Sequence, residues 1–148
     1  MKPDGSLPHP DEPLAVFLRG TSRWHTDSSF RDVPCLATVL YAITVPPERG
    51  DTLFANMIAA YDSLDAAERR ELERRRVVHS YAYSRSANPG KLAPMSAEEL
   101  ALVPDVAHPM IRQHADGRRS VFLGGHASHI EGERLTPAAR TFVRSKIA

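Results

Sequence analysis

The chain has 148 residues, which is enough for one domain that buries roughly 70% of its unfolded surface and too few for two full domains. Its 19 basic and 18 acidic residues leave a formal net charge of +1, so nucleic acid and anionic membrane are not expected as partners, whereas a small molecule is. The single cysteine, Cys35, excludes an internal disulfide and a cysteine-based zinc site.

The N-terminal third is predicted to contain an arm and three strands. Residues 1–13 hold four prolines and no apolar periodicity, so we expect a flexible arm in front of one domain over residues 14–148. The apolar run Leu14–Arg19 predicts a short strand. Leu36–Val45, rich in β-branched and aromatic residues, is the strongest strand candidate, and Thr52–Ala55 is expected to return beside it. No signal-peptide pattern or long apolar run is present, and the cytoplasm is the expected compartment.

Two helices and a strand are predicted in the middle of the chain. Asn56 is a suitable N-cap for a helix over Met57–Leu64. Asp65 caps a second helix, Ala66–Arg76, whose arginines alternate with glutamates, so that helix is expected to be exposed. Val77–Tyr83 has the alternation of a strand.

The remaining third begins with an expected mobile loop, Ser84–Pro94. Ser96 and Glu99 form a capping box for a short helix ending at Leu102. His108–Gln113 and Ser120–Leu123 flank Asp116-Gly117, which predicts a hairpin. Thr136-Pro137 predicts a final helix over Ala138–Ile147. Short strands with interspersed surface helices indicate a mainly β domain with helical insertions, a partial double-stranded β-helix or jelly roll.

One short motif, His25-Thr26-Asp27, suggests metal chemistry. Residues i and i+2 of an extended backbone point to the same side, so the imidazole and the carboxylate could reach one metal ion. Two histidines and one carboxylate that leave three coordination positions open are diagnostic of non-haem Fe(II) oxygenases. Alone, an H-x-D triplet also fits a polar pair in a loop.

Four ordered segments carry a family resemblance. Trp24–Phe30 reads WHTDSSF, Gly50–Met57 reads GDTLFANM, His108-Pro109 is followed by Arg112, and Gly125–Gly132 reads GHASHIEG. Together these segments strongly resemble the taurine and 2,4-dichlorophenoxyacetate dioxygenase family, and the last one resembles the phenoxyacetate branch. The resemblance covers about three quarters of the chain.

The resemblance implies roles for seven residues and for two cofactors. Fe(II) would be held by the metal ligands His25 and Asp27, and 2-oxoglutarate would accept a hydrogen bond from Thr52; Trp24, Phe30, His126 and His129 would lie near the substrate. Other roles stay open: Thr52 as an ordinary strand threonine, Trp24 and Phe30 as core residues, and the two histidines as metal ligands, as donors to an anion or as structural residues. Arg85 and Lys91 are weaker candidates for contacting a carboxylate.

The implied activity is hydroxylation of a small anionic substrate, coupled to O₂ and to decarboxylation of 2-oxoglutarate to succinate. The GHASHIEG segment suggests an aryloxyalkanoate such as 2,4-dichlorophenoxyacetate, and a sulfonate or other small anion stays open. A homo-oligomer also stays open.

Two parts of the family pattern have no match. Nothing after Gly132 resembles the family's W-D-N-R segment with the second histidine ligand and the arginine that binds 2-oxoglutarate, and the region before Trp24 is short. We therefore expect jelly-roll strands to be absent at both ends. The alternatives to an active enzyme are a truncated non-catalytic remnant of the family and a small divalent-metal-binding module.

Overall fold

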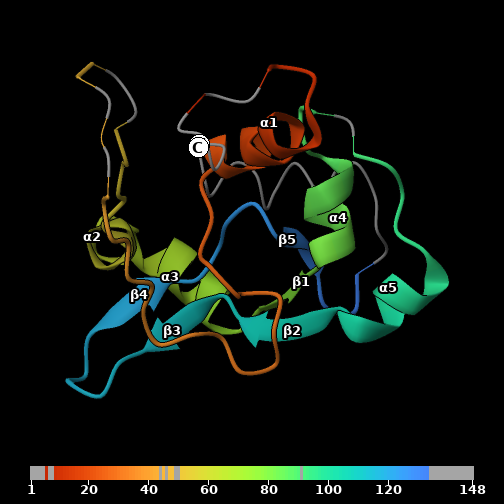
Figure 1. The fold of residues 1–148 in the computed structure, drawn as a ribbon. Coiled ribbons are helices and arrows are strands. Elements are labelled where there is room, and N and C mark those ends of the chain that lie inside the picture. The colour runs from red at the N-terminus through yellow and green to blue at the C-terminus, as the bar shows by residue number, and fades with distance from the viewer. Residues whose placement is uncertain are drawn as a thin grey trace.

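The computed structural model describes residues 6, 9–43, 45, 47, 48, 51–90 and 92–133. These residues form a mixed helix-and-strand fold with two small antiparallel sheets (Figure 1). The helices are α1 (Pro13–Leu18), the 3₁₀ helix η1 (Arg19–Ser22), α2 (Met57–Asp62), α3 (Ala66–Glu73), α4 (Tyr81–Ser86) and α5 (Ala97–Leu102); the strands are β1 (Arg76–His79), β2 (Val106–Pro109), β3 (Ile111–Gln113), β4 (Arg119–Val121) and β5 (Ala127–Ile130). The expected final helix Ala138–Ile147, Lys91 and most of the expected arm lie outside the described residues.

The core lies where the two sheets meet α2 and α3. One sheet has the order β2-β1-β5, and the other is the pair β3-β4. Val77 of β1 is fully buried between His108 and Ile130, its partners on the two neighbouring strands. Met110, between β2 and β3, is also fully buried and links the sheets, because its amide donates to Arg75 and its carbonyl accepts from Phe122. The other buried apolar members of the core are Tyr61, Leu72, Val121, Leu123, Ala127 and Ile130.

The predicted strand at Leu14–Arg19 is wrong, because this run forms α1 and the start of η1. A short apolar run fits a strand or a helix equally well by periodicity. Here Pro13 stands at the first helical position, where its fixed φ favours a helix. Val16 packs so tightly on Gly90 that a Cβ added to Gly90 would lie 2.6 Å from the valine Cγ1, which fixes α1 beside the loop after α4.

The three predicted helix starts that lie within the described residues are confirmed. Asn56 accepts hydrogen bonds from the amides of Ile58 and Ala59 at the start of α2. Asp65 and Ser96 each form a complete capping box, at the starts of α3 and α5. These caps satisfy amides that have no partner inside the helix, and they depend only on residues within one turn.

The single strand predicted over Val77–Tyr83 is wrong in its second half. Strand β1 ends at His79, and Ser80 becomes the N-cap of α4 by accepting a hydrogen bond from the amide of Tyr83. The preference of serine for an N-cap overrides the strand alternation here. As a result, α4 and the loop after it present positions 81, 84, 85 and 88 at the helical spacing of one face.

The predicted hairpin is confirmed between β3 and β4, and Gly117 in its turn has a φ of +85°. The longer strand expected over His108–Gln113 is instead divided at Met110. Its first part, in β2, pairs with β1, and its second part pairs with β4.

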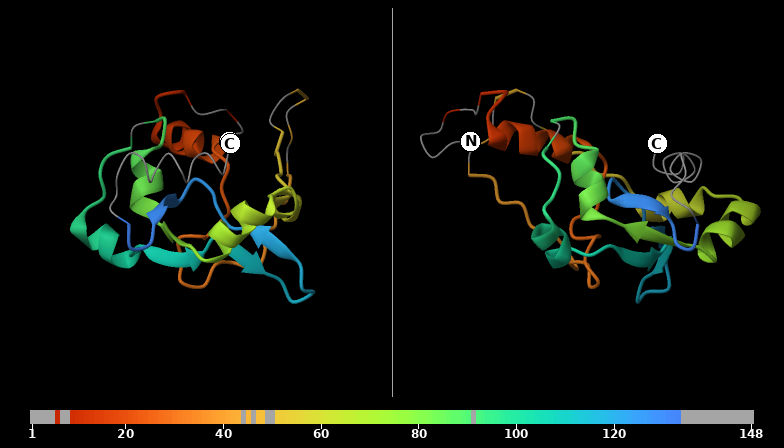
Figure 2. Two further views of the ribbon diagram at one scale, coloured as in Figure 1. Left: turned by 180° about the vertical axis from the view of Figure 1, so that it is seen from behind. Right: turned by 90° about the vertical axis from the view of Figure 1, so that its right-hand side faces the viewer.

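The predicted strand pair Leu36–Val45 and Thr52–Ala55 is not formed by the described residues of these ranges. This orange-to-yellow segment stands away from the body in both figures (Figures 1 and 2). Leu36, Tyr41 and Ile43 expose 103%, 86% and 88% of their surface. Strand preference needs a paired neighbour and a packed face to take effect, and the described chain supplies neither to this segment.

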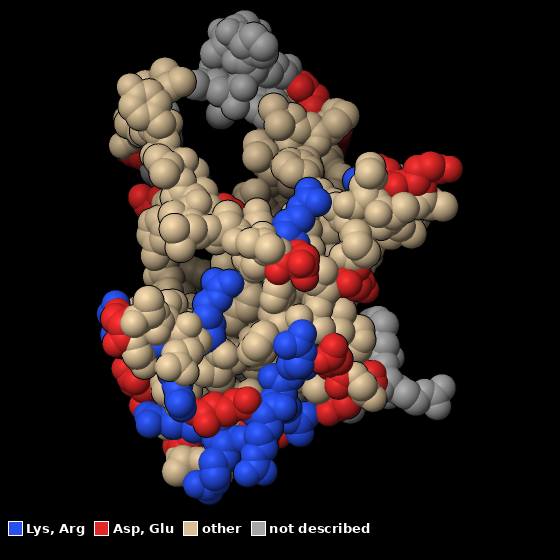
Figure 3. Space-filling view, turned by 90° about the horizontal axis from the view of Figure 1, so that it is seen from below, with Lys and Arg blue, Asp and Glu red and all other residues tan. Residues whose placement is uncertain are grey.

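Several charged side chains on the surface contact side chains of opposite charge. Arginines gather at one end of the view in Figure 3, with acidic residues among them. Arg75 contacts Glu71 and Glu133, and Arg76 contacts Glu131. This interleaving agrees with the predicted solvated helix face. None of the helices in the described part of the chain has the length and apolar character needed to span a bilayer.

Candidate active site

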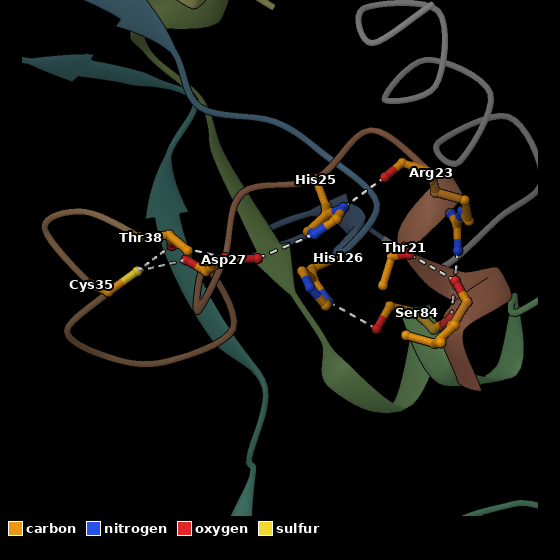
Figure 4. Close-up of polar contacts among 9 residues, drawn as sticks. Thr21, Arg23, His25, Asp27, Cys35, Thr38, Ser84 and His126 are labelled. Carbon is orange, nitrogen blue, oxygen red and sulfur yellow. Dashed lines mark hydrogen bonds and ion pairs between the residues drawn. The ribbon is translucent and has the colours of Figure 1, made fainter. Parts of the chain in front are cut away.

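His25 and Asp27 lie side by side in an irregular segment after η1 (Figure 4). Nε2 of His25 is 3.2 Å from Oδ1 of Asp27, and the two side chains expose 32% and 46% of their surface. The sequence predicted an extended backbone at these residues, whereas the structure has an irregular segment. The two side chains nevertheless lie side by side, as predicted. The pair is therefore accessible and only partly desolvated.

The protonation of the His25 ring shows why the pair suits a cation. Nδ1 of His25 lies 2.7 Å from the carbonyl oxygen of Arg23, which can only accept, so Nδ1 carries the proton. In the neutral ring, the lone pair of Nε2 then faces the carboxylate of Asp27. Two acceptors this close repel each other unless a proton or a metal ion lies between them. Metal–ligand bonds of about 2.1 Å at right angles place two ligand atoms about 3 Å apart, so the pair fits a divalent ion.

The chain after Asp27 holds the carboxylate in place. Ser28 has a φ of +58°, which is uncommon for a residue with a side chain and turns the backbone sharply. The turn leads to Cys35, whose thiol donates to the carbonyl of Asp27 at 3.3 Å. It also leads to Thr38, whose hydroxyl donates to Oδ2 of Asp27 at 2.8 Å. Oδ2 is thus occupied, and Oδ1 is left facing His25.

A cavity of about 610 Å³ opens beside this pair. Its aromatic lining residues are Phe17, Phe30 and Tyr81, and its polar ones include Arg23, Arg85 and His126. The remaining lining comes from η1, the 35–38 segment, the end of α4 and Gly125. Phe30 lies 4.8 Å from both Tyr81 and His126, measured between ring centroids. The volume is in the range of small-molecule sites, and an apolar wall with a few polar groups is typical of them.

His126 lies between the candidate ligands and α4, in the turn before β5. Its ring is 6.3 Å from that of His25, and its Nδ1 is 2.8 Å from the hydroxyl of Ser84 (Figure 4). Burial, with smaller contributions from the neighbouring His25 and Arg23 side chains, lowers the pKa of His126 to about 4. The ring is therefore neutral at physiological pH in the metal-free chain.

The structure separates the other expected site residues from this cluster. His129 lies within β5, bonded through Nδ1 to Ser128, and does not line the cavity, so it shares no helical face with His126. The side chain of Trp24 is 49% exposed and does not line the cavity. Its carbonyl accepts a hydrogen bond from the amide of Gly125. Thr52 is exposed in the segment that stands away from the body, and it does not line the cavity either.

His108 belongs to the scaffold. It lies in β2, and its Nε2 is 2.9 Å from the carbonyl oxygen of Arg31, in the loop after the candidate ligands. Arg112 lies over the ring of Phe122 and not in the cavity. The H-P-x-x-R element thus contributes to the scaffold, since His108 contacts the loop after the candidate ligands and neither residue lines the cavity.

Sequence reasoning missed Thr38, Ser84, Tyr81 and Arg23 as site residues. Recognising Ser80 as an N-cap would have revealed α4 and the cavity-facing positions 81 and 84. No sequence signal marks Thr38, because its bond to Asp27 spans 11 residues of irregular chain.

The chain has two further H-x-D triplets, and one of them, His9-Pro10-Asp11, provides an internal comparison. There Nδ1 of the histidine is 3.7 Å from the carboxylate, and the side chains are 70% and 86% exposed. Neither residue lines the cavity. The triplet pattern is therefore a solvated pair at His9 and Asp11, and part of a cavity-lined site at His25 and Asp27.

Among the described residues, no group of three or more histidine, cysteine, aspartate or glutamate side chains is arranged to hold a metal ion. His25 and Asp27 are two candidate ligands, and a facial triad needs a third. The described residues do not supply it.

The class of protein follows from comparison with known families. The model of the taurine catabolism dioxygenase TauD, TfdA family matches residues 4–144, so the chain belongs to this family of α-ketoglutarate-dependent dioxygenases. The resemblance read from the sequence is confirmed.

Particular relatives agree with this membership. The chain is 38% identical over 130 residues to the α-ketoglutarate-dependent 2,4-dichlorophenoxyacetate dioxygenase of Burkholderia sp. (strain RASC), covering 87% of this chain and 43% of that protein. It is 35% identical over 145 residues to the (S)-phenoxypropionate/α-ketoglutarate-dioxygenase of Sphingobium herbicidovorans, covering 93% of this chain and 50% of that one. The crystal structure of AAD-2 with Mn(II) and N-oxalylglycine superimposes with a TM-score of 0.83 at 32% identity, over 99% of this chain and 53% of that one. The chain thus spans about half the length of these relatives.

Proposed function

We propose that this protein is an Fe(II)- and 2-oxoglutarate-dependent dioxygenase that hydroxylates a small anionic substrate, with an aryloxyalkanoate as the substrate class. The observation that carries the proposal is the pairing of His25 Nε2 with Asp27 Oδ1, 3.2 Å apart, at a cavity of about 610 Å³. The relatives named for 2,4-dichlorophenoxyacetate and phenoxypropionate support the substrate class. The proposed fold of the domain is part of a jelly roll.

The chain's own residues would perform the binding and the positioning. His25 and Asp27 would hold the metal, and Thr38 would keep the carboxylate turned toward the imidazole. The aromatic side chains that line the cavity, Phe17, Phe30 and Tyr81, would pack on the substrate ring and exclude water from it. Fe(II), 2-oxoglutarate and O₂ supply the oxidising chemistry when bound.

Thr52 remains our proposed donor to 2-oxoglutarate. In the described conformation it is exposed and outside the cavity. The proposal therefore requires the 51–55 segment to lie against the site in the active protein. Trp24 and His129 are also proposed to contact the substrate, although neither side chain lines the cavity in the described conformation. We further propose a cytoplasmic location.

A second candidate function is a divalent-metal-binding protein without oxygenase turnover. It is favoured by the finding that the described residues group no third ligand beside His25 and Asp27. A two-ligand site binds metal more weakly than a three-ligand site, and it fixes the cosubstrate less well.

Calorimetric titration of the chain with Mn(II), followed by 2-oxoglutarate, tests the proposal. His25→Ala should abolish Mn(II) binding, whereas the matched variant His9→Ala, in the exposed His9-Pro10-Asp11 triplet, should leave it unchanged. The dioxygenase predicts that 2-oxoglutarate binds only when the metal is present. It also predicts that, with Fe(II) bound, phenoxyacetate, 2-oxoglutarate and O₂ are converted to phenol, glyoxylate, succinate and CO₂.

The outcomes separate the two candidates. Metal binding that depends on His25, without metal-dependent binding of 2-oxoglutarate, would favour the second candidate. Equal effects of the His25 and His9 substitutions would contradict both.

A further inference from the structure

Arg23 is a half-buried cation in the cavity wall, two residues before His25. Its carbonyl accepts from His25, while its guanidinium extends along the wall toward α4 (Figure 4). There Nη1 lies 3.5 Å from the carbonyl oxygen of Ser84, a long contact. Gly125 packs against the same side chain, since a Cβ added there would lie 3.7 Å from Cζ of Arg23.

The charges around the cavity leave Arg23 without a carboxylate. Among the described residues, no aspartate or glutamate lies within ion-pair distance of its guanidinium. Asp27, the carboxylate that lines the cavity, faces His25. The other cavity arginine, Arg85, donates to the carbonyl of Ala93 and lies 3.9 Å from Glu99. A partly desolvated guanidinium with one long contact to a neutral carbonyl favours an anion nearby.

We propose that Arg23 binds the carboxylate of the substrate, so that it selects anionic substrates in the same cavity. This inference rests on the proposed function and specifies which residue of the site recognises the charge. A guanidinium offers five N–H donors in a planar fork that matches a carboxylate, and the contact to Ser84 engages one of them. Phe17 and Tyr81 line the same cavity and suit the aromatic ring of an aryloxyalkanoate.

A structural role for Arg23 makes a different prediction. The same side chain could serve only to hold the Ser84 carbonyl near the end of α4. In that case its loss would disturb the cavity for every ligand, charged or neutral. A comparison of two ligands of the same shape therefore separates the two roles.

The experiment measures binding of phenoxyacetate and of its neutral analogue phenoxyacetamide by calorimetry, with Mn(II) and 2-oxoglutarate present. In Arg23→Gln, the affinity for phenoxyacetate should fall roughly 10- to 100-fold, as expected for loss of a hydrogen-bonded charge pair, and the affinity for the amide should change less than about twofold. Arg118→Gln removes an equal charge from the exposed hairpin, where Arg118 contacts Asp116, and should change neither affinity.

Three outcomes would overturn the proposal. These are an equal loss of affinity for acid and amide, no loss for the acid, and no binding of the acid by the unsubstituted chain. Mn(II) binding measured on the same variants keeps this test apart from the proposed function. If Arg23→Gln loses the preference for the acid but keeps His25-dependent Mn(II) binding, the result supports the role of Arg23 in binding the carboxylate. If the unsubstituted chain does not bind Mn(II), the result contradicts the proposed metal site.

Discussion

The hydroxyl of Thr38 donates a 2.8 Å hydrogen bond to Oδ2 of Asp27, on the side of the carboxylate opposite to His25. The bond joins the candidate metal site to the first residues of the segment that stands away from the body (Figure 4). Groups that hold a ligating carboxylate from behind set its orientation, and with it the affinity for the metal.

Thr38→Val should therefore weaken Mn(II) binding roughly tenfold, because the variant keeps the shape of the side chain and loses its donor. Thr38→Ser keeps the hydroxyl and should bind Mn(II) nearly as the unsubstituted chain does. Calorimetric titration of both variants measures the difference. Equal affinities for Val and Ser would show that the bond does not position Asp27.

Gly124 packs against the backbone of the candidate ligand His25. A Cβ added there would lie 3.1 Å from Cα of His25 and 3.3 Å from the amide nitrogen of Thr26, so the backbone must shift. We expect Gly124→Ala to weaken Mn(II) binding by roughly tenfold, since small displacements of ligands are costly.

Gly117→Ala is the control for a glycine substitution as such. Gly117 has a φ of +85° with open space around its Cα, so alanine there should cost about 1 kcal/mol of folding free energy and leave Mn(II) affinity unchanged. Urea unfolding and metal titration on both variants provide the comparison. If Gly117→Ala also lost metal affinity, the effect of Gly124→Ala could not be attributed to its contact with His25.

His79 should make folding sensitive to mild acid. The residue is 1% exposed between Phe122 and His108, and neither ring nitrogen has a hydrogen-bond partner among the described residues. Burial, together with the charge of His108, lowers the pKa of His79 to about 3. The unfolded chain, with a pKa near 6.5, therefore binds more protons than the folded chain between these two values.

Stability should accordingly be complete above about pH 6.5 and fall as the pH drops toward 3, by at most about 1.4 kcal/mol per pH unit from this group. His79→Phe should flatten that dependence, while His9→Ala, at an exposed histidine, should not. Urea unfolding at several pH values measures the slope. An unchanged slope in His79→Phe would show that His79 is not the group responsible.

The exposure of the apolar side chains in residues 36–43 should be measurable in solution. Tyr41 and Ile43 are almost fully exposed, and contiguous apolar surface of this kind binds hydrophobic dyes. Replacing both residues with lysine should reduce ANS fluorescence of the chain without changing Mn(II) binding. An undiminished ANS signal would mean that this segment is covered in solution.

The parts of the fold that could be predicted from the sequence are those stabilised within a few residues. The caps at Asn56, Asp65 and Ser96 use amides two or three positions away, and the β3-β4 turn needs only Asp116-Gly117. The errors at α1 and α4 arose where apolar runs fit both helix and strand, and a proline or a serine cap decided between them. The segment over Leu36–Val45 has strand-forming residues, but a strand also needs a partner.

The sequence by itself determined the family and the candidate pair His25 and Asp27, because ordered motifs at suitable spacing require no knowledge of contacts. Only the tertiary structure decided which side chains surround that pair. Ser84 meets His126 across 42 positions and Arg23 across 61, and such contacts arise from the docking of α4 beside η1 and β5. The spacing of residues along the chain carries no record of that docking, since it is stabilised by packing in the folded core.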